Sequence, residues 1–107
     1  MSVSQERRQA RRFPIERQLH YRVRGVKPEL KGSGVTVNMS SRGVLFRPET
    51  PLEHGKPVIL EISWPVLLND SRQLKLVARG HIVWSDTDLA AMKIETWEFR
   101  TTPSSLS

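Results

Sequence analysis

The chain has 107 residues, of which 37% are hydrophobic and 26% charged, which is the size and composition of one globular domain. It contains no cysteine, which excludes disulfides, thiolate zinc sites, iron–sulfur clusters and cysteine nucleophiles. No apolar run approaches the ~20 residues that a membrane-spanning helix needs, and the first residues contain no apolar signal core. We therefore expect neither membrane insertion nor export.

The net charge of +6 is concentrated near the N-terminus. Nine basic and three acidic residues lie up to Lys31, whereas the rest of the chain carries eight of each sign. Arginine is preferred, with 12 arginines against five lysines. Since the planar guanidinium group matches phosphate and the edge of guanine, this preference indicates a phosphate-bearing partner. A solvated basic tail is the plainer interpretation.

Alternating apolar and polar residues, separated by turn-forming residues, predict short strands along most of the chain. The predicted strands are residues 18–24, 35–37, 44–46, 58–64, 74–84 and 89–99. We expect Pro65 to end the fourth strand, with a loop over residues 65–72. Gly80 predicts a bulge or bend in its strand. The apolar spacing of the last strand shifts once, which predicts a second bulge there.

The alternation also predicts which aromatic side chains are buried. Tyr21, Phe46, Trp64 and Trp84 fit the core pattern. Six strands without an amphipathic helix predict an all-β fold, either a small barrel or a sandwich. Closure into a barrel would protect the strand edges from pairing with other chains.

Motifs for catalysis and metal binding are missing from the sequence. The histidines at 20, 54 and 81 have no metal-ligand spacing, and no nucleophile elbow, P-loop or zinc-protease motif is present. The aspartates at 70, 86 and 88 lie among turn formers, where they commonly bond to their own backbone. We therefore expect a protein that is not an enzyme and has no metal site.

Two short motifs carry recognisable binding chemistry. Arg8-x-x-x-Arg12 supplies cations that suit a compact dianion, although many basic tails contain this spacing. In Asn38-x-Ser40-x-x-Gly43, the amide and hydroxyl groups donate and accept hydrogen bonds, and the glycine permits a positive φ or close backbone approach. The second motif alone is equally compatible with a plain hairpin turn.

The order and context of the two motifs resemble the PilZ domain family. That family has R-x-x-x-R before its first strand and [D/N]-x-S-x-x-G between two later strands. The segments Glu6-Arg7-Arg8, 12–16 and 79–84 are also similar to the family, so the resemblance spans residues 6–99. It implies a six-stranded antiparallel β-barrel that binds cyclic di-GMP.

The resemblance also implies residue roles. Arg8 and Arg12 would contact phosphate and guanine, Asn38 and Ser40 would face a guanine edge and a nearby phosphate, and Gly43 would keep the turn open for the ligand. Arg7 would help to hold a second, intercalated ligand molecule.

Two features of the sequence bear on this assignment. Arg7 and Arg11 form an alternative arginine pair, but the pair ending at Arg12 directly precedes the apolar Phe13, as the family expects. Ala90 and Ala91 stand where many members have glycines, which bears on how closely a ligand approaches the last strand.

The domain limits and the mode of action follow from the resemblance. We expect a basic ligand-binding arm at residues 1–13, a barrel at 14–100 and a loose tail at 101–107. The arm would close over cyclic di-GMP and change the surface that the domain presents to a downstream protein, without catalysis. A bacterial cytoplasmic setting is implied by the family alone.

Two other functions stay open. A small β-barrel with a basic arm could bind nucleic acid, although the charge is confined to the arm and most aromatic residues fit the core. A barrel without ligand that acts as a protein-interaction module is the other alternative.

Overall fold

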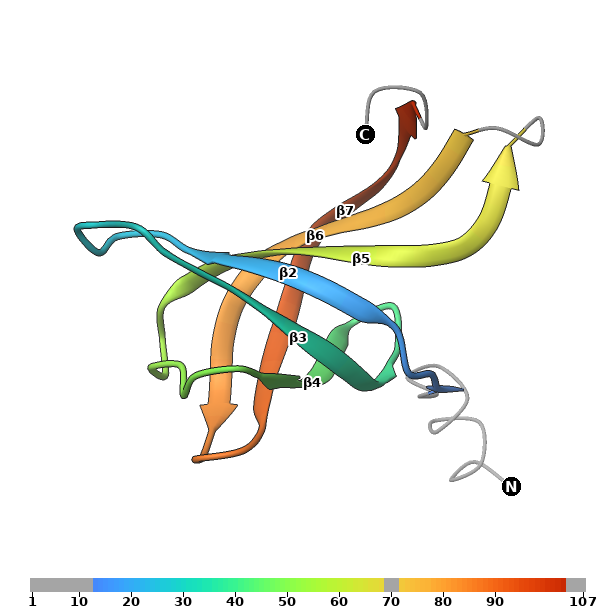
Figure 1. Ribbon diagram of the computed structural model, residues 1–107. Helices are drawn as coiled ribbons and strands as arrows, with labels where there is room; N and C mark the ends of the chain where they lie inside the picture. The colour runs from blue at the N-terminus through green and yellow to red at the C-terminus, as the bar shows by residue number, and fades with distance from the viewer. Residues whose placement is uncertain (1–12, 69–71, 104–107) are drawn as a thin grey trace, which may run out of the picture.

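The computed structural model describes residues 13–68 and 72–103 (Figure 1). Within these ranges all regular structure is β-strand, and no helix occurs. The strands are β1 (Phe13–Pro14), β2 (Gln18–Val23), β3 (Leu30–Met39), β4 (Gly43–Pro48), β5 (Pro57–Leu68), β6 (Arg72–Ser85) and β7 (Ala90–Pro103). The prediction of an all-β fold is confirmed.

Six of the strands close into an antiparallel barrel. Neighbouring strands follow the order β3-β2-β5-β6-β7-β4, and β4 pairs back with β3. The short strand β1 lies outside this ring and pairs only with β3. The six-stranded barrel is therefore confirmed, and closure satisfies the strand edges within the ring.

The core follows from the alternation of side chains along the strands. On β2, Leu19, Tyr21 and Val23 are buried, whereas His20 and Arg22 are exposed. Burying the large ring of Tyr21 is possible because its hydroxyl group has a partner, Thr50 Oγ1, at 2.9 Å. The other large, fully buried side chains come from the remaining five strands of the ring: Thr36, Phe46, Val58, Leu60, Ile62, Val77, Ile82 and Met92.

The predicted bulge at Gly80 is present. Arg79 lies opposite Thr96 and Gly80 opposite Ile94, so β7 carries one extra residue, Glu95. The two backbones approach so closely here that a Cβ atom on Gly80 would lie 1.7 Å from the carbonyl oxygen of Lys93. Only glycine fits, and the bulge also accounts for the slip in the apolar spacing of the last strand.

The prediction that Trp84 belongs to the core is wrong. Ile82 lies opposite Met92 and Trp84 opposite Ala91, so Val83 is an extra residue on β6. An extra residue breaks the two-residue alternation of faces. Trp84 is consequently 47% exposed, although the sequence period places it on the buried face with Ile82.

The prediction that Pro65 ends its strand is also wrong. The strand β5 continues to Leu68, and its ladder with β6 is irregular between Ser63 and Leu67. Proline has no N–H group to donate, so it is tolerated where the ladder is interrupted. Of the loop predicted at residues 65–72, only 69–71 lie outside the two strands, and these are outside the described residues.

Three strands continue past the ring at one end of the barrel, as Figure 1 shows for β5, β6 and β7. The partner strand β2 leaves β5 at Ile62, and β4 leaves β7 at Lys93. We call this part (residues 63–68, 72–75 and 94–103) the extension. The last strand thus ends at Pro103 instead of the predicted Phe99. The domain limits stay predictions.

We expect Gly80→Ala to lower the free energy of unfolding by about 2 kcal/mol or more, because the methyl group must push β7 away from β6. Urea denaturation followed by tryptophan fluorescence measures this change. Thr96→Ala, an exposed substitution opposite Arg79 beside the same bulge, is the control and should change stability much less. Equal stability of the Gly80→Ala and wild-type proteins would contradict the close approach.

Candidate functional site

The arginine arm joins the barrel beside the second motif. Arg7, Arg8 and Arg12, together with the alternative Arg11, lie outside the described residues. The described chain begins at Phe13, whose backbone pairs with Met39, while Pro14 pairs with Asn38. The junction between the basic segment and the barrel is therefore in register with the start of the motif.

A buried threonine fixes this junction. Thr36 is 1% exposed, and its Oγ1 accepts a hydrogen bond from the Arg17 N–H at 2.7 Å and donates one to the Ile15 carbonyl oxygen. Two backbone bonds add to this contact: Thr36 N–H donates to Arg17 O at 2.9 Å, and Ile15 N–H to Val37 O at 3.3 Å. Residues 15–17 are thereby held against β3, just before Asn38.

Arg17, one of the nine N-terminal basic residues, has a structural role. Its Nε donates to the Ser63 carbonyl oxygen at 3.0 Å, and its Nη2 donates to Ser63 Oγ at 3.1 Å. These bonds connect the junction to β5 at the point where the extension begins. The guanidinium group of Arg17 is therefore occupied within the barrel.

The motif Asn38–Gly43 forms the turn between β3 and β4. Ser40 N–H donates to the Gly43 carbonyl oxygen at 2.9 Å, and Ser40 Oγ accepts from Arg42 N–H at 3.1 Å. Ser40 thus has the local role that a plain turn requires. Accepting one bond uses a lone pair and leaves the hydroxyl proton available for a ligand.

Asn38 has an unsatisfied polar atom. Its Oδ1 is buried and has no hydrogen-bond partner among the described residues. A buried acceptor without a partner costs roughly 1–3 kcal/mol, and such groups are rare in native proteins. Asn38 therefore offers an acceptor whose hydrogen bond has to come from something other than the described barrel.

Gly43 is explained by packing between strands. A Cβ atom at this position would lie 2.8 Å from the carbonyl oxygen of Met92 on β7. Positive φ angles occur instead at Gly25 and Gly55 among the described glycines. Close approach of β7, one of the two roles expected for this glycine, therefore requires it, and its role toward a ligand stays a prediction.

A hollow of about 300 Å³ on the barrel surface brings part of the motif together with two cations. Ser40 and Gly43 line it, with Arg42 and Lys93 beside them, and both basic residues are exposed. Asn38 is outside this lining. We call this feature the turn hollow; its charge suits an anionic ligand.

Sequence reasoning missed both cations of the turn hollow. Arg42 lies inside the motif at a position where the motif accepts any residue. Lys93 is brought there because it pairs with Gly43 across β4 and β7. Ala91 also lines the hollow, where it adds one methyl group, whereas Ala90 is fully buried.

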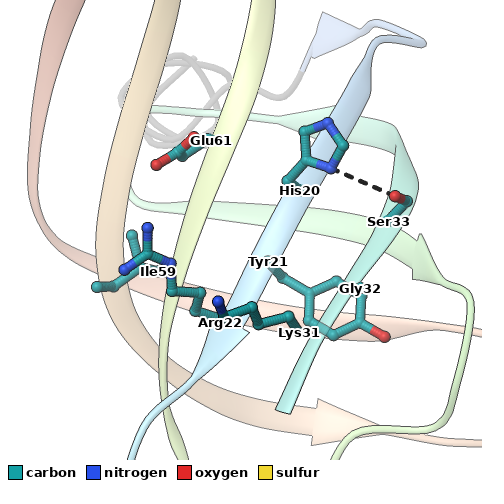
Figure 2. A pocket seen from close by; sticks show the side chains of 8 residues that line it. All are labelled: His20, Tyr21, Arg22, Lys31, Gly32, Ser33, Ile59 and Glu61. Carbon is teal, nitrogen blue, oxygen red and sulfur yellow. Dashed lines mark hydrogen bonds between the residues drawn. The ribbon is translucent and has the colours of Figure 1, made fainter. Parts of the chain in front are cut away.

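A second hollow, of about 320 Å³, lies on the outer face of β2, β3 and β5 (Figure 2). Arg22 and Lys31 are opposite each other in its wall, and His20 Nδ1 lies 3.3 Å from Ser33 Oγ. It contains none of the predicted site residues. From Ser33 to Ser40 the chain extends about 20 Å along β3, so the two hollows are separate.

The described chain shows neither a metal-binding cluster nor a membrane-spanning helix. Residues 13–68 and 72–103 contain no group of three or more His, Asp or Glu side chains placed to hold a metal ion. The same ranges contain no helix of the length and apolarity that a membrane span needs.

The family comparison agrees with the two motifs. The PilZ domain family matches residues 6–103, which include the arginine segment, the turn and the whole barrel. The chain therefore belongs to the PilZ domain family, a receptor type that binds cyclic di-GMP and is generally not catalytic. No curated protein and no solved structure matches the chain.

We expect Thr36→Val to lower the free energy of unfolding by about 1–3 kcal/mol, because it leaves the Arg17 N–H and the Ile15 carbonyl without their hydroxyl partner. Urea denaturation measures the change. Thr36→Ser keeps the hydroxyl group and should retain more stability than the valine variant. The reverse order would contradict the assigned role of the hydroxyl.

Proposed function

We propose that this protein is a receptor for cyclic di-GMP in which Arg8 and Arg12 hold the ligand against the turn Asn38–Gly43. The observation that carries the proposal is the pairing of Phe13 with Met39 and of Pro14 with Asn38. Phe13, which directly follows the arginine motif in the sequence, thereby lies beside the start of the second motif. Neither motif alone is specific, but this proximity supports a ligand shared by both.

The reach of the chain supports this arrangement. Arg12 is bonded to Phe13, and the five residues from Arg8 to Arg12 span at most about 17 Å when extended. Both arginines are therefore within reach of the turn hollow. Cyclic di-GMP has two phosphates and two guanines, and the guanidinium fork matches phosphate oxygens as well as the O6 and N7 acceptors of guanine.

The turn supplies the complementary groups. Guanine presents N–H donors on its base-pairing edge, and Asn38 Oδ1 is an acceptor without a partner in the described barrel. The Ser40 hydroxyl can donate to a phosphate oxygen, with Arg42 and Lys93 adding positive charge. Ligand binding would thus relieve the cost of the buried Asn38 acceptor.

The proposed action needs no bond to be made or broken. The ligand orders the arm against the turn, which costs conformational entropy and leaves a new surface for a downstream protein. Arg7, next to the motif pair, would hold a second ligand molecule if two bind. The stoichiometry of titration distinguishes one molecule from two.

Nucleic-acid binding remains the second function to exclude. Trp84, Trp97 and Phe99 are exposed, which weakens the sequence argument that the aromatic residues are buried in the core. However, Glu95 bonds to His81 and Glu98 pairs with Arg79 and Arg100 along the same stretch, so Trp97 and Phe99 do not border the positively charged groove that single-strand binding uses. Single-stranded DNA should therefore bind much more weakly than cyclic di-GMP in the same titration.

We expect Arg8→Ala and Arg12→Ala each to weaken cyclic di-GMP binding at least tenfold, because each removes a charged donor contributing about 1.5–3 kcal/mol. Isothermal titration calorimetry measures the affinity, and circular dichroism checks the fold. Arg11→Ala is the matched control for the alternative arginine pair. Arg22→Ala is the control for the hollow in Figure 2.

The pattern among these four variants decides between sites. If Arg11→Ala lowers the affinity and Arg8→Ala does not, the ligand-binding pair is Arg7 and Arg11 instead of Arg8 and Arg12. Loss in Arg22→Ala alone would place the ligand on the outer face of β2. Unchanged affinity in all four variants would refute the arginine assignment.

We expect Asn38→Ala and Ser40→Ala to weaken binding as well. Asn38→Ala removes the unpartnered acceptor, so it should lower affinity with little loss of stability. Ser40→Ala also removes a turn hydrogen bond and should lower both affinity and melting temperature. Calorimetry and thermal unfolding of the same samples separate the two effects. Lower melting temperatures with unchanged affinity would support a plain turn.

A further inference from the structure

One edge of β7 has no partner strand over most of its length. On that side β4 pairs with Ala90 to Lys93, and Ile94 N–H still donates to the Arg42 carbonyl oxygen at 2.8 Å. From Glu95 to Pro103, no strand in the described chain pairs with this edge. Proteins usually protect an edge of this length, because its free N–H and C=O groups pair with another chain.

Aromatic side chains lie along the same stretch. Trp97 is 52% and Phe99 44% exposed. They lie opposite the core residues Ala78 and Leu76, so they continue the inner face of the barrel into the extension. Phe99 packs edge-on against Trp97 at 5.7 Å and against Trp64 at 5.3 Å between ring centres. We call Trp64, Trp97 and Phe99 the aromatic cluster.

The charges beside Phe99 are self-complementary. Glu98 and Arg100 flank it and project on the opposite face of the strand, where Glu98 pairs with Arg100 and with Arg79 within one chain. In an antiparallel pairing of two β7 edges centred on Phe99, Glu98 of each copy faces Arg100 of the other. Phe99 then faces Phe99 of the second copy, and Trp97 faces its Thr101.

We propose that two copies of this protein associate through the β7 edge from Glu95 to Pro103, antiparallel about a two-fold axis at Phe99. The second copy pairs with β7 where β4 leaves it. The two extensions become one continuous sheet, and both aromatic clusters lie on the same face of it. This dimer goes beyond cyclic di-GMP binding and does not depend on it.

A charge swap tests the pairing. Glu98→Arg places arginine opposite arginine, and Arg100→Glu places glutamate opposite glutamate. We expect each variant to raise the dimer dissociation constant about tenfold in sedimentation equilibrium. The double variant Glu98→Arg/Arg100→Glu, and an equimolar mixture of the two single variants, should recover association because opposite charges face each other again.

Two further variants separate association from folding. Phe99→Ser removes the central contact and should also weaken the dimer, whereas Glu53→Arg, an exposed charge reversal between β4 and β5, should leave it unchanged. Thermal unfolding of each variant checks the fold. A wild-type protein that is monomeric up to its solubility limit would overturn the proposal. So would single variants whose mixture does not associate.

Discussion

The hydroxyl group of Thr36 holds together the two parts of the chain on which the candidate site depends. It bonds to the backbone on both sides of Glu16, at Ile15 and Arg17, from a fully buried position on β3. The same strand carries Asn38 two residues later and closes the barrel against β4. The strand β3 therefore holds the segment through which the arm enters, closes the ring by pairing with β4, and leads into the turn.

Irregularities in the strands occur where the barrel ends. Glu95 is an extra residue on β7 just past Lys93, where the pairing with β4 ends. The ladder of β5 becomes irregular after Ser63, just past Ile62, where the pairing with β2 ends. A bulge increases the local twist and bends the strand. Departures from regular pairing thus coincide with the points where the extension and the free edge of β7 begin.

The strands and the two motifs could be predicted from the sequence because they depend on local patterns, whereas closure into a six-stranded barrel was implied by the family resemblance. A two-residue alternation identifies a buried face, and Gly80 marks a close approach that no other residue permits. The exposure of Trp84 and the position of Lys93 could not be predicted in this way. Both depend on the register between strands, and one bulged residue changes that register for everything beyond it.

A hydrogen bond connects the turn to β7 just before the free edge begins. Arg42, in the turn, accepts it from Ile94, and Glu95 next to Ile94 begins the edge without a partner. The proposed ligand site and the proposed dimer edge therefore lie on adjacent backbone. If cyclic di-GMP changes the association of two copies, thermodynamic linkage requires the dimer to change the affinity for cyclic di-GMP by the same factor. Titrating the ligand into wild-type protein and into the Glu98→Arg variant measures that factor directly, and equal affinities would mean that the two surfaces act independently.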